Sequence, residues 1–245
     1  MVKIGIIGGS GLDDPELLRE AVEKNAQTRY GKTSSTLTCG KIQGVDVVIL
    51  ARHGKGHSIP PSKVNYTANI QALKDEGCTH ILAATAVGSL CEEIKPGNLV
   101  FPSQVIDLTK QRQMTFFTDT VVHTPMAEPF SKKLRSLLCD ACKDLGFSYN
   151  TDVTIITIEG PRFSTKAESF MFRALGADII NMSTCPEIFL ANEAGIPYQS
   201  IAMSTDYDCW KEGEEPVTFE MVMERMKENA DKVKKLLLQV IPKIR

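Results

Sequence analysis

Two aspartates spaced two residues apart follow an apolar segment near the C-terminal third of the chain. Residues 200–208 read SIAMSTDYD, so a strand-like run ends in Asp206 and Asp208. Side chains alternate along a strand, so both carboxylates are expected on one face. Open α/β sheets bind ligands beyond the carboxyl ends of their strands. The pair could therefore hold a substrate rich in N–H donors, a divalent metal ion, or only solvent.

The N-terminal segment ends in a pattern suited to a small anion. Residues 2–7 are apolar except for Lys3 and lead into a glycine-rich turn at 8–11 with Ser10 at its centre, and a helix is expected to begin at 13–16. Such a turn lets backbone N–H groups approach an anion closely. The dinucleotide fingerprint G-x-G-x-x-G and the Walker lysine are both missing. The segment indicates either an anion cradle or a plain tight turn.

Two further strand-like segments end in residues that suit phosphate. Arg52 and His53 follow segment 45–51, with His57 close behind, and segment 79–85 ends in Thr85 and is followed by Ala86. An arginine offers a planar fork of donors to phosphate oxygens, and a hydroxyl or imidazole can add another donor. Taken singly, Arg52 could form an ion pair and the histidines could be structural. Together these strand ends favour a phosphate site.

Composition limits the classes of protein to be considered. The 245 residues suit one large domain, and 28 basic against 30 acidic residues give a net charge of −2. This balance gives no reason to expect nucleic acid or an anionic membrane as a partner. No apolar run approaches the ~18 residues of a spanning helix and no signal peptide is evident, which predicts a cytoplasmic protein. Seven scattered cysteines, including a CxxC at Cys139 and Cys142, favour reduced structural thiols over disulfides or a metal site.

Short apolar runs alternate with amphipathic segments, which is typical of an α/β fold. Segment 36–49 reads as a hairpin, so the central sheet should be mixed. Thr165 with Glu168, and Thr184 with Glu187, match the capping box that begins a helix. We expect strands at 2–7, 45–51, 79–85, 97–107, 152–158, 178–182 and 197–205, and further helices at 131–145 and 219–240.

Six segments together resemble the signature motifs of S-methyl-5′-thioadenosine phosphorylases. They are GGSGL at 8–12, ARHG at 51–54, PSKVNY at 61–66, TIEGPRFS at 157–164, NMST at 181–184 and TDYDCW at 205–210. The match runs in order through nearly the whole chain. That family belongs to the trimeric class of the purine nucleoside phosphorylase superfamily. The resemblance implies a single α/β domain over residues 1–245, with a mixed twisted sheet flanked by helices, assembled as a homotrimer or a dimer of trimers.

The resemblance also implies a role for each matching residue. Phosphate would be bound by Ser10, Arg52, His53, Thr85, Ala86 and Ser183. The nucleoside would lie over Met182, with its base near Phe163, Ser164, Asp206 and Asp208. Its 5′-methylthio group would contact Phe219 and Val222, with His57 at the mouth and His123 contributed by a neighbouring subunit. Carboxylates accept hydrogen bonds from an amino group and repel a carbonyl, so the two aspartates favour adenine over 6-oxopurines.

The implied reaction is phosphorolysis of S-methyl-5′-thioadenosine to adenine and 5-methylthioribose 1-phosphate. Phosphate would attack the anomeric carbon while the glycosidic bond breaks through an oxocarbenium-like state, helped by positioning and charge stabilisation. Asp206, if protonated, could act as general acid toward the imidazole-ring nitrogen of the purine, which requires a raised pKa. Inorganic phosphate is the co-substrate, and no metal or organic cofactor is expected.

Other functions remain open from the sequence. The alternative within the same class is a purine nucleoside phosphorylase of broader specificity, acting on adenosine, inosine or methylthioinosine. Loop 109–122 is short and the chain stops soon after its last helix, which favours a looser 5′ pocket than in longer family members. A nucleosidase that uses water would have no need of Arg52. A nucleotide-binding redox domain would carry an acidic residue where Arg52 follows the second strand.

Overall fold

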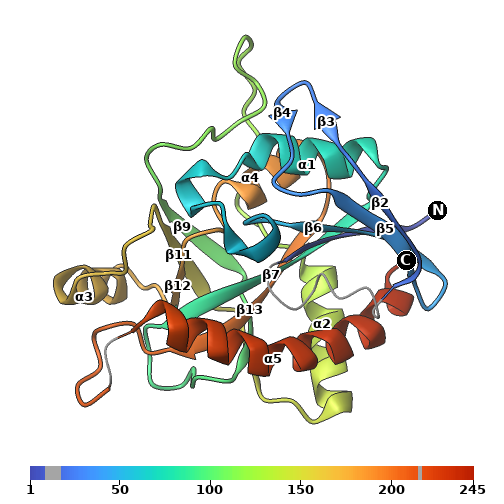
Figure 1. Ribbon diagram of the computed structural model, residues 1–245. Coiled ribbons are helices and arrows are strands. Elements are labelled where there is room, and N and C mark those ends of the chain that lie inside the picture. The colour runs from blue at the N-terminus through green and yellow to red at the C-terminus, as the bar shows by residue number, and fades with distance from the viewer. Residues whose placement is uncertain (9–17, 215–216) are drawn as a thin grey trace.

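The computed structural model describes residues 1–8, 18–214 and 217–245, and a mixed sheet runs through its centre (Figure 1). The strands are β1 (Lys3–Gly8), β2 (Arg19–Lys24), β3 (Gln27–Thr28), β4 (Gly31–Lys32), β5 (Leu37–Ile42), β6 (Val45–Ala51), β7 (His80–Ser89), β8 (Leu99–Phe101), β9 (Gln104–Leu108), β10 (Tyr149–Thr151), β11 (Thr154–Ile158), β12 (Ile179–Asn181) and β13 (Tyr198–Asp206). The helices are α1 (Tyr66–Asp75), α2 (Lys132–Leu145), α3 (Lys166–Ala174), α4 (Glu187–Glu193) and α5 (Phe219–Val240), with 3-10 turns at Lys55–His57, Pro61–Lys63 and Ile241–Lys243.

Eleven of the described strands form one sheet, and its centre is parallel. The main path runs β10-β8-β13-β7-β1-β6-β5-β2, and β9, β11 and β12 branch from it beside β7. Strands β6, β1, β7 and β13 pair in parallel, so their carboxyl ends lie at the same edge. The β5–β6 hairpin and the β7–β12 pair are antiparallel. The mixed sheet expected from the sequence is therefore confirmed.

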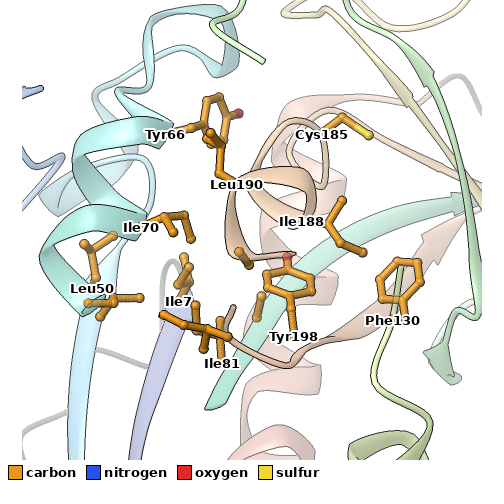
Figure 2. Packing of buried hydrophobic residues seen from close by; sticks show 14 of the residues in the cluster. Ile7, Leu50, Tyr66, Ile70, Ile81, Phe130, Cys185, Ile188, Leu190 and Tyr198 are labelled. Atoms are coloured by element: carbon orange, nitrogen blue, oxygen red, sulfur yellow. The ribbon is translucent and has the colours of Figure 1, made fainter. Parts of the chain in front are cut away.

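Helices cover both faces of the sheet (Figure 1). On one face α1 and α4 pack over the central strands, and Figure 2 shows Ile70 of α1 and Ile188 of α4 in the same apolar cluster as Ile81 of β7. On the other face α2 and α5 bury residues such as Leu138 and Leu237. Each fully buried side chain of this size contributes about 1.5–3 kcal/mol. The two layers hold the sheet, and with it the strand ends, in place.

The predicted strands are present, with one exception that has a local cause. Segment 97–107, expected as one strand, forms β8 and β9 instead, because Pro102 between them has no N–H to donate to a sheet ladder. Strand β2 was not predicted, since every one of its residues is exposed and it shows no apolar alternation. The helix expected to begin at 13–16 lies outside the described residues. All seven cysteines are free thiols, as expected.

A helix begins near each of the four predicted starts that fall in the described residues, and three of them begin as predicted. Ser131 accepts a hydrogen bond from the N–H of Leu134 and begins α2. Thr165 and Glu168 form the reciprocal capping box at the start of α3. The C-terminal helix spans 219–240, as its apolar spacing predicted. These starts are set by residues within one helical turn of each other, so the local sequence is enough to define them.

The capping box predicted at Thr184 and Glu187 is wrong. Pro186 occupies the N-cap position of α4 and no side chain caps this helix. The Glu187 carboxylate instead binds Arg52, which lies 135 residues earlier in the chain. The Thr184 hydroxyl accepts a hydrogen bond from the side chain of Asn181. A distant charged partner has thus overridden the local capping pattern.

Candidate active site

A cavity of about 370 Å³ lies at the edge where the carboxyl ends of β6, β7 and β13 meet. It brings together residues from the beginning, middle and end of the chain. Those predicted from the sequence that line it are Arg52, His53, His57, Thr85, Ala86, Phe163, Ser164, Met182, Ser183, Asp206, Asp208, Phe219 and Val222. Two predicted residues are not among them. Ser10 lies outside the described residues, and His123 is exposed on the loop before α2 and does not line the cavity of its own chain.

Arg52 lies at one end of the cavity and is held by a buried carboxylate. Its Nε and Nη2 donate to the two oxygens of Glu187, at 2.6 and 2.7 Å, and its Nη1 donates to the carbonyl of Ala84 at 2.9 Å. Burial acts to lower the pKa of Arg52, but Glu187 outweighs it and holds that pKa above its ordinary value. Within residues 1–8, 18–214 and 217–245, three of the five guanidinium N–H groups are used. The other two, on Nη1 and Nη2, remain for an anion in the cavity.

Glu187 is a residue of this site that the sequence did not reveal. Its side chain is completely buried, and besides Arg52 it accepts a hydrogen bond of 2.7 Å from the hydroxyl of Tyr198. The guanidinium charge is therefore compensated before any ligand binds. An anion at this end would be held by directed N–H and O–H groups more than by net charge.

Hydrogen-bonded hydroxyl and amide side chains lie at the same end of the cavity as Arg52. The Asn181 side-chain amide donates to Thr85 Oγ1 at 3.1 Å, and its carbonyl oxygen accepts from Thr157 Oγ1 at 2.9 Å. Thr85 Oγ1 lies 2.9 Å from Ser183 Oγ. The single Thr85 hydrogen can go to Ser183 or to the carbonyl of Ala86, at 3.1 Å, and in the first case the hydrogen of Ser183 is free to point at an anion. Asn181, for which the sequence predicted no role, orients the Thr85 hydroxyl.

His53 faces the same end as a neutral imidazole. Its Nδ1 lies 3.0 Å from the carbonyl oxygen of Ile59, which can only accept, so Nδ1 carries the hydrogen. Burial, and then the nearby charge of Arg52, lower the pKa of His53 to about 3. Nε2 is consequently an acceptor at neutral pH. The ring stacks on His57 with centroids 4.5 Å apart, and His57 in turn lies 5.6 Å from Phe219.

Asp206 is the last residue of β13 and is buried. A bulge interrupts the pairing of β13 with β7 between Ser204 and Asp206, so the consecutive residues Thr205 and Asp206 both reach the cavity. Thr205 Oγ1 donates to one Asp206 oxygen and the N–H of Asp208 to the other, each at 2.7 Å. Burial raises the pKa of the Asp206 carboxyl, and the charge of Asp208 adds to this, against the two hydrogen bonds.

Asp208 reaches the cavity in a different way from the one expected. It lies after the end of β13 with a left-handed φ of 49°, so strand alternation does not place it. The turn nevertheless brings it beside Asp206. Gly88 on β7 makes room for the pair, because a Cβ there would lie 2.8 Å from an Asp206 oxygen.

The other end of the cavity is apolar and is formed largely by α5. Phe219 and Val222 were predicted, and Met223 and Met226 line the cavity beside them. Residues at i, i+3, i+4 and i+7 share one face of a helix, so this spacing could have identified both methionines. Ser164 also lines the cavity, and its Oγ is buried without a partner in the described structure, which leaves it available to a ligand.

Nearly the whole chain matches known phosphorylases. Residues 3–242 match the family model described as the phosphorylase superfamily. The S-methyl-5′-thioadenosine phosphorylases of Xenopus tropicalis and Danio rerio are 57% and 56% identical to it, over 99% of this chain and 89% of each relative. This chain belongs to the phosphorylase superfamily, among the S-methyl-5′-thioadenosine phosphorylases.

Solved structures of this family have the same fold. Methylthioadenosine phosphorylase from Schistosoma mansoni in complex with adenine superposes with a TM-score of 0.95 at 44% identity, covering 99% of this chain and 91% of that one. A variant of the adenosine/methylthioadenosine phosphorylase of that organism, in complex with methylthioadenosine, has a TM-score of 0.93 at 43% identity, with the same coverage. The family and the fold class expected from the sequence motifs are confirmed.

The described residues add two findings on membranes and metals. Among residues 1–8, 18–214 and 217–245, no helix is long and apolar enough to cross a bilayer. The same residues contain no cluster of three or more His, Cys, Asp or Glu side chains that could hold a metal ion.

Proposed function

We propose that this chain catalyses the phosphorolysis of S-methyl-5′-thioadenosine to adenine and 5-methylthioribose 1-phosphate, a reaction of purine and methionine salvage. One observation carries the proposal. A single cavity joins an end lined by N–H and O–H donors, a buried acid pair and an apolar helix face. These three surfaces suit phosphate, adenine and a methylthio group in turn.

The donor end would bind inorganic phosphate, the co-substrate. The two remaining N–H groups of Arg52 and the hydroxyl of Ser183 point donors at its oxygens. His53 Nε2, an acceptor, would take the hydrogen that a hydrogen phosphate ion carries. A phosphate oxygen held in this way is oriented for attack on the anomeric carbon, with Met182 beneath the ribose. No metal or organic cofactor takes part in the proposed reaction.

The acid pair would bind and protonate the leaving base. As the glycosidic bond breaks, negative charge develops on the purine, and a protonated Asp206 would donate its hydrogen to the imidazole-ring nitrogen. The raised pKa of Asp206 supports this role. Carboxylate oxygens of Asp206 and Asp208 would accept from the 6-amino group, and the unpartnered Ser164 hydroxyl would contact the base.

Adenosine is a second candidate substrate. An S. mansoni relative is described as an adenosine/methylthioadenosine phosphorylase, and Phe219, at the apolar end here, is half exposed. A 5′-hydroxyl could be solvated at such an opening. The two aspartates would still exclude inosine and other 6-oxopurine nucleosides.

Assembly into a homotrimer or a dimer of trimers is part of the proposal, as is a cytoplasmic location. Val121 and Val122 are exposed beside His123, and Phe170, Met171 and Leu175 are exposed along α3. Exposed apolar clusters of this kind suit contact with another subunit. In such an assembly His123 would reach the apolar end of the neighbouring cavity, which it does not reach in its own chain.

The deciding experiment measures adenine release from methylthioadenosine with and without phosphate, beside adenosine and inosine. We expect release to depend on phosphate and to be fastest with methylthioadenosine. Release without phosphate would overturn the role given to Arg52 and His53. A preference for inosine would overturn the roles of Asp206 and Asp208.

A further inference from the structure

The first part of the loop between β9 and α2, residues 109–128, has one buried side chain. Residues 109–128 are exposed or half-buried apart from Arg112, whose side chain is only 1% exposed. Arg112 does not line the active-site cavity. Its contacts nevertheless reach three of the segments that do.

The Arg112 guanidinium makes six hydrogen bonds within the protein. Nε donates to Glu159 Oε1 at 3.0 Å, and Nη2 donates to the carbonyls of Glu159 and Ile158 at 2.7 and 3.3 Å. Nη1 lies within hydrogen-bond distance of three oxygens: the carbonyls of Met182 and Cys185, at 2.8 and 2.6 Å, and the hydroxyl of Tyr66 at 3.0 Å. These acceptors engage all five N–H groups of the guanidinium, whereas a lysine could supply only three.

Two of these acceptors belong to the segment that carries the ribose and phosphate contacts. The carbonyls of Met182 and Cys185 flank Ser183, whose hydroxyl faces the donor end of the cavity. The hydrogen bonds from Arg112 hold both carbonyls in place, so they also hold the backbone on either side of Ser183. The same guanidinium therefore positions the floor of the ribose site and one phosphate donor.

Other acceptors belong to the wall near the base. Ile158 and Glu159 begin the segment that continues to Phe163 and Ser164, both of which line the cavity. Glu159 also binds the loop in return, because its second oxygen accepts the backbone N–H groups of Lys110 and Gln111. Burial acts to raise the pKa of Glu159, but these N–H groups and Arg112 outweigh it and hold that pKa below its ordinary value.

The third contact reaches a further wall through Tyr66 at the start of α1. The Tyr66 hydroxyl accepts from Arg112 and donates to the carbonyl of Pro61 at 3.1 Å. Pro61 lines the cavity. The Arg112 guanidinium also lies over the Tyr66 ring, 5.3 Å from its centroid. One side chain thus joins the base wall, the ribose floor and the Pro61 wall.

We propose that Arg112 is a positioning residue for phosphorolysis, which sets the separation between the base subsite and the phosphate subsite. The inference rests on the proposed function. Phosphate and the anomeric carbon must meet in a narrow geometry, and a misplacement of about 1 Å can lower a rate about 10²-fold. Each subsite keeps its own contacts without Arg112, so loss of this residue acts on turnover more than on binding.

The test compares R112K with R135K in steady-state phosphorolysis of methylthioadenosine. Arg135 is a matched control, because it is also buried and paired, with Asp152 at 3.0 Å, but lies on α2 and does not line the cavity. For R112K we expect kcat to fall at least about 10-fold while the KM values for nucleoside and phosphate change less than about 3-fold. R135K should keep the wild-type kcat, and thermal unfolding of both variants reports the folded fraction.

A second variant guards against simple misfolding. R112A leaves space for free guanidinium, which should restore part of the lost kcat in a saturable way, whereas R135A should show no recovery. A wild-type kcat in R112K, or a loss no larger than the loss of folded protein, would overturn the proposal. Failure of the wild-type protein to release adenine with phosphate would instead contradict the proposed function.

Discussion

The two ends of the cavity are built on different principles. At the donor end, the side chains of Arg52 and Glu187 are 3% and 0% exposed, and their hydrogen bonds are mostly made within the protein. That end is formed where strands of the central sheet finish. At the apolar end, α5 supplies one helix face, and Phe219 is 50% exposed.

Because of this difference, we expect the polar residues at the strand ends to set the reaction rate and the apolar residues of α5 to select the nucleoside. Buried polar networks are satisfied only in one arrangement, so a change in one member disturbs the others. An apolar helix face makes many weak contacts, and each can be altered with a small effect. Substitutions near the strand ends should therefore lower rate or stability, while substitutions on α5 should change which nucleoside is preferred.

The largest effect is expected for D206N, at the sheet-built part of the site. Asparagine keeps one oxygen to accept from the Asp208 N–H, and its amide can donate to the Thr205 hydroxyl, which can turn to the carbonyl of Val87, but it cannot give up a proton to the purine. Loss of a general acid lowers kcat by about 10²–10⁴-fold. Steady-state adenine release measures it, with D208N as the control, for which a smaller loss is expected. Equal losses of kcat in D206N and D208N would show that Asp206 is not the general acid.

E187Q tests whether the buried ion pair stabilises the donor end of the cavity. The substitution leaves Arg52 buried without a counter-charge, which costs about 3–5 kcal/mol of unfolding free energy. Urea denaturation measures this loss. E20Q is the control, since the pair of Glu20 with Lys41 is exposed and worth at most about 1 kcal/mol. A stability equal to that of wild type would show that Arg52 does not depend on Glu187.

H53N tests the buried donor end through the pH dependence of the unfolding free energy. The pKa of His53 is lowered from 6.5 to about 3, so the unfolded chain binds a proton that the folded chain does not. Stability is therefore lost as pH falls below 6.5, by about 1.4 kcal/mol per pH unit. Between about pH 7 and about pH 5, urea denaturation of H53N should show about 2 kcal/mol less loss than wild type. Parallel curves for the two proteins would contradict the neutral, buried imidazole.

The smallest effect is expected for V222A at the apolar end. Loss of two methyl groups removes about 1.5 kcal/mol of apolar contact with a methylthio group, or about 10-fold in kcat/KM. Adenosine, which lacks that group, serves as the internal control and should change little. An equal loss with both nucleosides would show that Val222 supports the fold of the cavity and does not select the 5′ substituent.

The sequence predicted those site residues whose position depends on their immediate neighbours in the chain. Arg52 and Asp206 each follow an apolar run directly, so their places at strand ends could be predicted. Thr85, also expected at a strand end, lies inside β7, which continues to Ser89. Pro102 could have divided the strand expected at 97–107, because proline cannot donate to a ladder. The spacing of Met223 and Met226 also carried a usable signal.

The remaining features depend on partners far apart in the chain. Glu187 matched a local capping pattern, and only its pairing with Arg52, 135 residues away, shows its actual role. Arg112 lies in a loop without periodicity, and its acceptors come from three other segments. Such hydrogen bonds are decided by tertiary packing, which no pattern within a few residues records.

The bulge in β13 makes the site depend on residue count as well as residue type. In a regular strand, Thr205 and Asp206 would point to opposite sides of the sheet. The extra residue in the pairing with β7 lets the hydroxyl and the carboxyl meet in one cavity. Deleting a single residue here would conserve nearly the whole composition of the chain and still separate the acid from its partner. Anyone grafting this acid onto another scaffold would have to copy the backbone irregularity along with the side chains.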